Sequence, residues 1–392
     1  MIDTTNASAP PLIIVGGSTR SAAFSAVRAG FHPICFDLHA DLDARQVASC
    51  HRLAEYPESI PQVLADLPRT PVIYVGGLEN SPEILDAIQQ HHELWGNGGE
   101  ALTNSRDFTV VQEVLRMSRA PIAEWRFAAD TPPRDGNWMR RPLAGTGGRG
   151  IHVWDEGEQS TLKLTEPHGF QQRIEGIPHS ALFIADNEVG DVQFVGVTRQ
   201  LIGIEPLGAQ PHQWCGNIGP VTLPVEVEHL VRRVGNVLKW KCGMRGMYGV
   251  DFILGTDNRP WVTEVNPRYP ASAELLEWAT ENPLLQAHAR CFGYQPEAPA
   301  AWRGMPVGDF CGKAIVYATS DCTVTPAARE FAKASNPWHF PAIADIPAPG
   351  TQLKSGDPIC TVFATSANAV NCTTTLLDRA LEIREQLAQP VG

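Results

Sequence analysis

Three polar residues alternate along residues 261–270, whose sequence is WVTEVNPRYP. Glu264, Asn266 and Arg268 occupy every second position, which predicts that they share one face of a β-strand. Thr263 and its β-prone neighbours would then form the half-buried opposite face. An acid, an amide and a guanidinium on one face could bind a metal ion and an anionic group.

Asp251 offers a second carboxylate, 13 residues before Glu264, with the turn-like sequence GTDNRP between them. The two segments are predicted to pair as a hairpin. If both carboxylates point to one face, they and the Asn266 amide oxygen form an all-oxygen site, which Mg²⁺ prefers when substrate phosphates supply further ligands. A divalent ion would also relieve the repulsion between the carboxylates. A charged, solvent-facing strand would show the same spacing, so both interpretations stay open here.

Arg268 is a candidate for holding an oxyanion. Its planar fork matches a substrate carboxylate or a transferred phosphoryl group. The alternative is a simple ion pair with a neighbouring acid.

A glycine-rich run, GTGGRG at residues 145–150, lies between two β-prone segments and predicts the turn of a hairpin. Its backbone N–H groups, together with Arg149, could cradle a phosphate. The run lacks the Lys-Ser/Thr and helix of a Walker loop, and also the strand and helix that flank a dinucleotide-binding fingerprint. Arg140 and Arg141 precede it and would place fixed positive charge beside the same phosphates. The alternatives are a mobile turn and two solvated arginines.

Two further segments could line a pocket. Residues 205–224 are rich in Pro and Gly and are predicted to form a loop, in which His212, Trp214 and Cys215 are pocket wall or packing. Cys215 has no identifiable base to activate it as a nucleophile. The sequence VGGSTR, with Asp37 some twenty residues later, superficially suggests NAD binding, but the third glycine is missing. The alternative is a tight turn whose helix N-terminus faces a crevice and binds an acidic substrate group.

The elements that must position these residues fall into three units. Residues 1–105 alternate short apolar strands ending in Gly-Gly with helices, which predicts a small parallel α/β domain. Residues 106–304 follow an α+β pattern with antiparallel strands and a helix near 225–241. Residues 305–392 suggest a small C-terminal lobe of strands and one long helix. The predicted fold class is therefore mixed α/β and α+β.

Composition excludes several functions. The chain has 392 residues, with 31 Lys plus Arg against 43 Asp plus Glu, so its net charge of −12 argues against a general nucleic-acid or anionic-membrane surface. Nine scattered cysteines without a Cys-x-x-Cys pair favour a reducing compartment over a disulfide framework or a zinc site. No signal peptide and no run approaching ~20 apolar residues is present. We therefore expect a cytoplasmic protein with no membrane or nucleic-acid partner.

The order of these motifs resembles the ATP-grasp superfamily, and within it the carboligases related to biotin carboxylase. The resemblance rests on the small α/β unit, the basic strand with its Gly-rich hairpin, and the sequences QQRIEG, GVDF and TEVNPR, and it covers residues from about 11 to 300. It implies an ATP-grasp architecture in which residues 1–105 form the domain that precedes the ATP-grasp region. It also implies ATP and Mg²⁺ (or Mn²⁺) as cofactors.

The resemblance implies roles for individual residues. The metal ligands would be Asp251, Glu264 and Asn266, while Arg268 and Arg141 would act on the transferred phosphoryl group and the substrate carboxylate. Gln171 and the backbone of Arg173 and Ile174 match the adenine-binding segment, and Glu175 and His179 would contact the nucleotide or its ribose. The nucleotide-binding set is completed by Arg141 and the loop that closes over the triphosphate: Gly145, Thr146, Gly147, Gly148, Arg149 and Gly150.

The sequence departs from this pattern at two lysines. The usual Lys-Pro before the Gly-rich loop is Arg141-Pro142, and a lysine that often follows an Asp is replaced in Asp107-Phe108. Arg141 keeps the positive charge and the metal set is complete, so the resemblance still predicts an active enzyme.

The implied reaction joins a carboxylate to an amine through an acyl phosphate, releasing ADP and phosphate. Family associations suggest the addition of an amino acid such as glutamate in the biosynthesis of a methanopterin- or methanofuran-type cofactor. The alternatives are a bicarbonate-activating carboxylase and a non-catalytic nucleotide sensor. The acid, the amine and the oligomeric state, including a homo-oligomer, stay open.

Overall fold

The N-terminal unit contains the predicted parallel sheet, which has five strands in the order β3-β2-β1-β4-β5. The computed structural model describes residues 9–157, 167–186, 190–295, 297 and 310–390. Short apolar strands alternate with helices because each parallel connection must cross over the sheet. The strands are β1 (Pro11–Val15), β2 (His32–Asp37), β3 (Ser49–Arg52), β4 (Pro71–Tyr74) and β5 (Glu93–Leu94), and the helices are α1 (Arg20–Arg28), α2 (Ile60–Ala65) and α3 (Pro82–His91).

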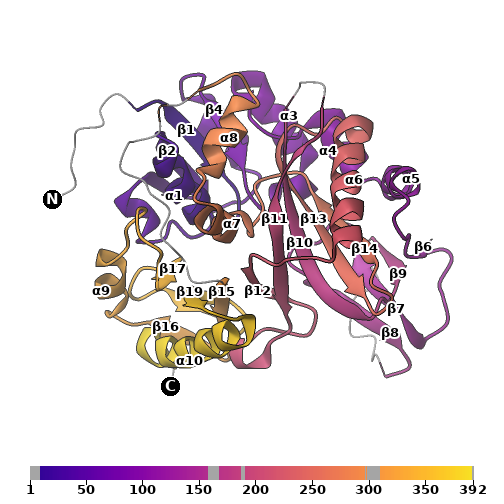
Figure 1. Cartoon of the computed structure of the whole chain (residues 1–392). Coiled ribbons are helices and arrows are strands. Elements are labelled where there is room, and N and C mark those ends of the chain that lie inside the picture. The colour runs from indigo at the N-terminus through magenta and orange to yellow at the C-terminus, as the bar shows by residue number, and fades with distance from the viewer. Residues whose placement is uncertain (1–8, 158–166, 187–189, 296, 298–309, 391–392) are drawn as a thin grey trace.

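An eight-stranded antiparallel sheet forms the centre of the molecule, with strand order β14-β13-β10-β11-β12-β15-β19-β17. Helix α6 (Val225–Cys242) covers one face of it (Figure 1), and apolar side chains of β10, β13 and β14 pack there in one cluster with the helix. Helices α7 (Ala273–Thr280) and α8 (Leu284–Arg290) lie against α1 of the N-terminal unit. The strands from this part of the chain are β10 (Gly176–Ala185), β11 (Gln193–Ile202), β12 (Trp214–Gly219), β13 (Gly246–Gly255) and β14 (Pro260–Asn266).

One sequence prediction here is wrong. Residues 205–224 are not a continuous loop, because β12 lies within them and pairs with both β11 and β15. Its composition hides the strand: Gly216 and Gly219 stand where neighbouring chain approaches closely, and a Cβ on Gly216 would lie 2.1 Å from the Lys313 carbonyl oxygen. Glycine in a strand is a mark of such close approach.

A smaller lobe carries the predicted Gly-rich hairpin. Its four-stranded sheet has the order β6-β9-β7-β8, and β7 pairs antiparallel with β8 as predicted. Helices α4 (Gly99–Arg106) and α5 (Phe108–Ser118) lead into the lobe. The strands are β6 (Trp125–Phe127), β7 (Asp135–Pro142), β8 (His152–Asp155) and β9 (His168–Gln172).

The C-terminal segment extends the central sheet. Strand β15 (Phe310–Tyr317) pairs with β12, and β19 (Pro358–Ser366) and β17 (Ile343–Ala344) follow outward, so one sheet passes through the predicted boundary at residue 305. Residues 298–309, where that boundary falls, lie outside the described residues. The domain limits therefore stay predictions. The remaining elements are β16 (Cys322–Val324), α9 (Ala328–Lys333), β18 (Gln352–Leu353), α10 (Ala369–Leu387) and β20 (Ala388–Pro390).

The mixed class predicted from sequence is confirmed, with a parallel N-terminal sheet and antiparallel sheets after it. Among the helices that the structure describes, none is long and apolar enough to cross a membrane. All nine cysteines are free thiols.

Candidate active site

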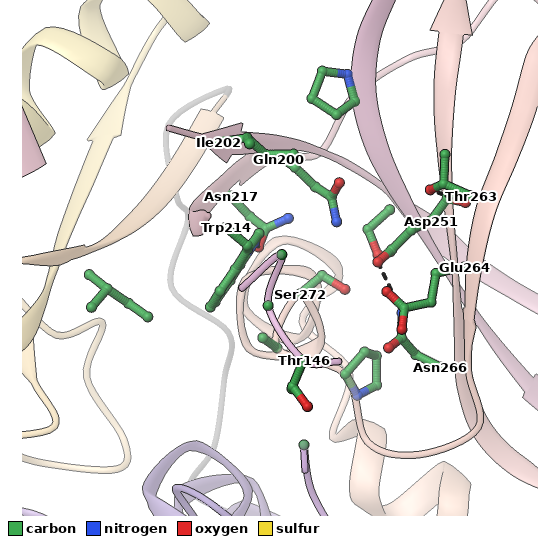
Figure 2. Close-up of a pocket in the computed structure, with 18 of the residues that line it drawn as sticks. Thr146, Gln200, Ile202, Trp214, Asn217, Asp251, Thr263, Glu264, Asn266 and Ser272 are labelled. Carbon is green, nitrogen blue, oxygen red and sulfur yellow. Dashed lines mark hydrogen bonds between the residues drawn. The ribbon is translucent and has the colours of Figure 1, made fainter. Parts of the chain in front are cut away.

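A pocket of about 450 Å³ lies where the three parts of the chain meet. The Gly-rich hairpin, the central sheet, the Gly-Gly turns of the N-terminal unit and residues of β15 and β19 all contribute to its wall. Figure 2 shows Asp251, Glu264 and Asn266 along one side, opposite Gln200 and Trp214. The polar face predicted from WVTEVNPRYP therefore lines a cavity.

The predicted hairpin is formed, and Asp251 lies directly opposite Glu264 in the β13–β14 register. A β-bulge follows this pair, because Phe252 then pairs with Val262 and leaves Thr263 as the extra residue. The bulge changes the alternation, so Thr263 lines the pocket with Glu264 instead of the opposite face. The sequence prediction for Thr263 is wrong for this reason.

Asp251 is a buried carboxylate with one unused oxygen. Its Oδ2 accepts a hydrogen bond from Asn266 Nδ2 at 3.0 Å, while Oδ1 has no hydrogen-bond partner among the described residues. Burial, followed by the charge of Glu264, raises the pKa of Asp251 from 3.8 to about 6. A buried acceptor without a donor is destabilising, so this oxygen is suited to a cation that arrives from outside.

Glu264 is held in its ionised form by arginines. Burial by itself would raise its pKa, but the charges of Arg141 and Arg106 outweigh burial and lower the pKa below its ordinary value. Arg106 Nη1 donates to Glu264 Oε1 at 2.7 Å. The two facing carboxylates therefore differ, since Glu264 stays charged and Asp251 resists ionisation.

Arg268 is fixed by a residue from the N-terminal unit. Its Nε donates to Glu79 Oε1 at 2.8 Å, and its Nη2 donates to Asn266 Oδ1 at 3.0 Å. Gly76 lies against the guanidinium, because a Cβ there would stand 3.4 Å from Arg268 Cζ. Glu79, Arg268, Asn266 and Asp251 thus form one hydrogen-bonded chain along the pocket wall.

The Gly-rich turn lies across the pocket and is held from two sides. Asn80 Nδ2 donates to Thr146 Oγ1 at 3.1 Å, and the backbone N–H of Trp214 donates to the Gly147 carbonyl at 2.9 Å. Gly148 has φ +77° and lies so close to residue 212 that a Cβ would stand 2.0 Å from the His212 carbonyl oxygen. Glycine is thus needed at position 148 for the turn to lie this close to His212.

Gly148→Ala is expected to displace the turn from the His212–Trp214 segment and to raise about tenfold the KM for the nucleotide that the sequence resemblance implies. A left-handed conformation costs a non-glycine residue about 1–2 kcal/mol, and here a backbone contact is added. Gly147→Ala is the matched control, since Gly147 also has a positive φ, +63°, but a Cβ there meets nothing within 4 Å. Steady-state kinetics on both variants separates the clash with His212, which only Gly148→Ala introduces, from the backbone strain that both variants share. Equal KM values for the two variants would show that the clash has no effect.

The basic strand before the turn divides its arginines between two faces. Arg141 lines the pocket, and its Nη1 donates to Gln171 Oε1 at 2.8 Å and to the Thr263 carbonyl at 3.0 Å. Burial lowers the pKa of Arg141. Arg140, the preceding residue of β7, is buried and is absent from the pocket lining. Strand alternation therefore directs Arg141, and not Arg140, into the pocket.

The structure brings together most, but not all, of the residues proposed from sequence. One pocket is lined by Asp251, Glu264, Asn266, Arg268, Arg141, Gln171, Thr146, Gly147 and Gly148. Gly145 and Arg149 line a small recess beside the turn, and Gly150 packs against Pro142.

Four proposed nucleotide contacts do not line the pocket. Arg173, Ile174 and Glu175 form the connection from β9 to β10, and the first and last of them are exposed. His179 stacks on Phe252, with ring centroids 5.3 Å apart. Its neighbours Pro178 and Ser180 do face the pocket, so β-strand alternation directs His179 to the other side of β10.

The remaining sequence candidates have clear places. His212 and Trp214 line the pocket, whereas Cys215 is fully buried and burial raises the pKa of its thiol to about 11. Asp37 accepts hydrogen bonds from the backbone and hydroxyl of Thr19. Asp37 therefore holds the residue that follows the Gly-Gly turn and Ser18, and its carboxylate is occupied by Thr19. This arrangement agrees with the tight turn that the sequence offered as the alternative to NAD binding.

Sequence reasoning missed Glu79, Asn80, Arg106 and Lys313. The first three reach the site from the N-terminal unit and from α4, and Lys313 reaches it from β15. For Glu79 and Asn80 the only sequence signal is their position after the second Gly-Gly turn, because ligands commonly bind at the carboxyl ends of parallel strands. Arg106 and Lys313 carry no such signal.

The central part of the chain is similar to known proteins. A family model described as an ATP-grasp domain matches residues 111–272. An uncharacterized protein of Methanocaldococcus jannaschii is 25% identical over 229 residues, which cover 57% of this chain and 50% of that protein. The chain thus matches only half the length of this curated relative.

Solved structures share the fold over nearly the whole chain. The biotin carboxylase domain of 2-oxoglutarate carboxylase from Hydrogenobacter thermophilus, solved with MgADP and bicarbonate, has a TM-score of 0.69 at 12% identity, covering 97% of this chain and 91% of that one. The L-amino acid ligase of Bacillus licheniformis has a TM-score of 0.66 at 15% identity, with 98% and 99% coverage. N5-carboxyaminoimidazole ribonucleotide synthetase of Thermotoga maritima has 0.63 at 13%, with 97% and 100% coverage.

Proposed function

We propose that this chain, whose residues 111–272 match a model of the ATP-grasp domain, is an ATP-dependent ligase that joins a carboxylate to an amine through an acyl phosphate. One observation carries the proposal above the others. Asp251 and Glu264 face each other across a hairpin, with Asn266 beside them, inside a pocket that the Gly-rich turn covers.

The residues of this face fit Mg²⁺ or Mn²⁺. Asp251 presents a buried oxygen without a donor, and Glu264 is kept ionised. The Asn266 amide lies beside them, with its nitrogen donating to Asp251 and its oxygen accepting from Arg268, so the oxygen would have to exchange Arg268 for the metal. No group of three or more His, Cys, Asp or Glu side chains suited to a metal occurs in the described part of the chain. Magnesium is commonly held by one or two carboxylates plus substrate phosphates, so we infer that metal and nucleotide bind together. The bound ion would neutralise charge on the phosphates.

The wall of the pocket offers separate places for the parts of ATP. Thr146, Gly147 and Gly148 line the pocket, where their backbone N–H groups would bind the phosphates, and Arg141 would add a fixed charge in place of the usual lysine. Met139 and Ile253 supply an apolar surface for the base, with Gln171 beside them as its polar contact.

Catalysis in this proposal consists of positioning and charge neutralisation. Arg268 orients the substrate carboxylate, one oxygen of which attacks the γ-phosphorus while the bond to the β-phosphate oxygen breaks and ADP leaves. The amine nitrogen then attacks the acyl carbon, the bond from carbon to the phosphate oxygen breaks, and phosphate departs. The amine proton passes to phosphate or solvent.

The test is ATP-dependent phosphate release from the purified chain with Mg²⁺ and a matrix of carboxylic acids and amines, with glutamate among the amines. Release that requires both an acid and an amine supports the ligase. Glutamate as the amine, with a pterin- or furan-type acid, would support the proposed role in cofactor biosynthesis. Tight ATP binding without release under any pair would instead indicate a nucleotide sensor.

A bicarbonate-activating carboxylase is the second candidate, favoured by the fold shared with a biotin carboxylase domain at a TM-score of 0.69. In that reaction bicarbonate takes the place of the acid. ADP release that depends on bicarbonate alone, in buffers otherwise free of CO₂, would decide for the carboxylase and against the ligase.

A further inference from the structure

Two cysteines face each other on neighbouring strands of the N-terminal parallel sheet. In the register of β2 and β3, Cys35 is the partner of Cys50. Neighbouring strands lie about 4.8 Å apart, which is within the range of Cα separations, about 4.4–6.8 Å, that a disulfide spans. This strand pair forms one edge of the sheet, and neither cysteine lines the pocket.

Both cysteine side chains lie on the same face of the sheet. Cys35 belongs to the apolar cluster that includes Ala22 of α1, and Cys50 packs against the same cluster. The residues that follow them, Phe36 and His51, stack on the other face with ring centroids 4.8 Å apart. Side chains alternate along a strand, so the stacked rings and the two thiols agree on one register.

The two thiols are in hydrogen-bonding contact. This contact with Cys50, followed by burial, raises the pKa of Cys35 well above its ordinary value, so the Cys35 thiol keeps its proton. The two sulfurs therefore meet in the folded chain without any change in strand pairing.

Cys50 is the accessible member of the pair. All nine cysteines lie among the described residues, and eight of them are buried, whereas Cys50 is partly exposed. Its strand, β3, pairs with β2 alone among the described strands and leaves its other edge open. An oxidant in solution therefore meets Cys50 first, with Cys35 directly beside it as a second thiol.

We propose that Cys35 and Cys50 are a site of oxidative modification, at which a hydroperoxide produces a reversible disulfide. The Cys50 sulfur attacks one oxygen of hydrogen peroxide, an S–O bond forms, the O–O bond breaks, and water leaves. The Cys35 sulfur then attacks the Cys50 sulfur, the S–S bond forms, the S–O bond breaks, and a second water carries away the Cys35 proton. The sulfurs together lose two electrons, which the peroxide gains. In a reducing compartment such a disulfide is transient and serves as a sensor.

Peptide mapping tests the disulfide directly. Trypsin cuts after arginine, and Arg45 is the only cleavage site between the two cysteines. Cys35 and Cys50 therefore fall on separate peptides, residues 29–45 and 46–52. The whole chain would be treated with a low molar excess of hydrogen peroxide, alkylated with iodoacetamide under denaturing conditions and digested. We expect the two peptides to be linked, the thiol count to fall by two from nine, and dithiothreitol to restore all nine thiols.

Three variants separate this pair from the other cysteines. Cys50→Ser and Cys35→Ala should each abolish the linked peptide. Cys291→Ser is the matched control, because Cys291 belongs to the same apolar cluster but its thiol donates to the Ala287 carbonyl, and it should give the linked peptide in unchanged yield. Oxidation of Cys50 to its sulfinic acid with Cys35 left free would overturn the disulfide, and so would an equal loss of thiols in Cys50→Ser.

The disulfide would also fix the edge strand. Three of the four residues of β3 are exposed, and strands of this kind open locally at low cost. A covalent bond to β2 restricts such opening, so the backbone N–H groups of β3 should exchange with deuterium at least about threefold more slowly in the oxidised chain. Equal exchange in the oxidised and reduced chains would overturn the fixing of the strand. These measurements contain no ATP, metal or substrate, so their outcome is independent of the proposed ligase function.

Discussion

Glu264→Gln is expected to reduce ATP-dependent phosphate release by about 10²–10³-fold or more, the scale on which loss of one charge-stabilising group affects catalysis. The substitution removes a negative charge and leaves the size of the side chain unchanged. Arg106 would still find an amide oxygen where it now finds Glu264 Oε1. The loss should therefore fall on activity and leave the folded state intact.

The physical reason lies in the different states of the two facing carboxylates. Arg141 and Arg106 keep the pKa of Glu264 low, whereas burial keeps that of Asp251 high. Glu264 is thus the carboxylate of the two that stays ionised over the wider pH range. Without that charge, the arginines leave the face net positive and repel Mg²⁺.

Phosphate release as a function of Mg²⁺ concentration, together with thermal unfolding, checks this prediction. Glu124→Gln is the control, because Glu124 also accepts from an arginine, Arg126, but at the surface. The control should keep full activity. If Glu264→Gln turned over at a near-normal rate, the metal assignment would be wrong.

The fold could be predicted largely because its signals are local. Apolar strands followed by Gly-Gly indicate parallel βα units, and the spacing of Asp251 and Glu264 around a turn indicates their hairpin. Both features are confirmed. The segment that contains β12 escaped prediction because its glycines, Gly216 packed closely against β15 and Gly219 against β11, resemble a loop in composition.

The site could be predicted only as far as one strand pair determines it. The bulge at Thr263 depends on pairing with β13, and the orientation of His179 depends on the β10 register, neither of which a single segment encodes. Glu79 lies 189 residues before its partner Arg268 in the sequence. Arg106 lies 158 residues before its partner Glu264. Only the assembled structure brings such residues together.

Asp251→Asn is expected to abolish metal-dependent turnover and, at the same time, to stabilise the protein when no ligand is present. The raised pKa of Asp251 means that the folded state disfavours its ionised form. Asparagine fills the same space without charge. The expected gain in the free energy of unfolding at pH 8 is on the order of 2 kcal/mol, from a pKa shift of about two units.

The sign of the pH dependence follows from this shift. The folded-state pKa of Asp251, about 6, lies above its ordinary value of 3.8, so between these values the folded state binds the proton more tightly than the unfolded state. The unsubstituted protein therefore keeps the Asp251 contribution to stability below about pH 4 and loses it as the pH rises through 6. The advantage of Asp251→Asn should be full at pH 8 and should vanish near pH 4.

Urea unfolding at several pH values, without nucleotide or metal, measures this advantage. Asp257→Asn is the control, since Asp257 lies in the exposed turn of the same hairpin and its substitution should show no such pH profile. A destabilised Asp251→Asn protein at pH 8 would contradict the argument. Asp251→Asn thus lowers activity and raises stability, because the buried, ionised Asp251 carboxylate is unfavourable in the folded state until a bound cation compensates its charge.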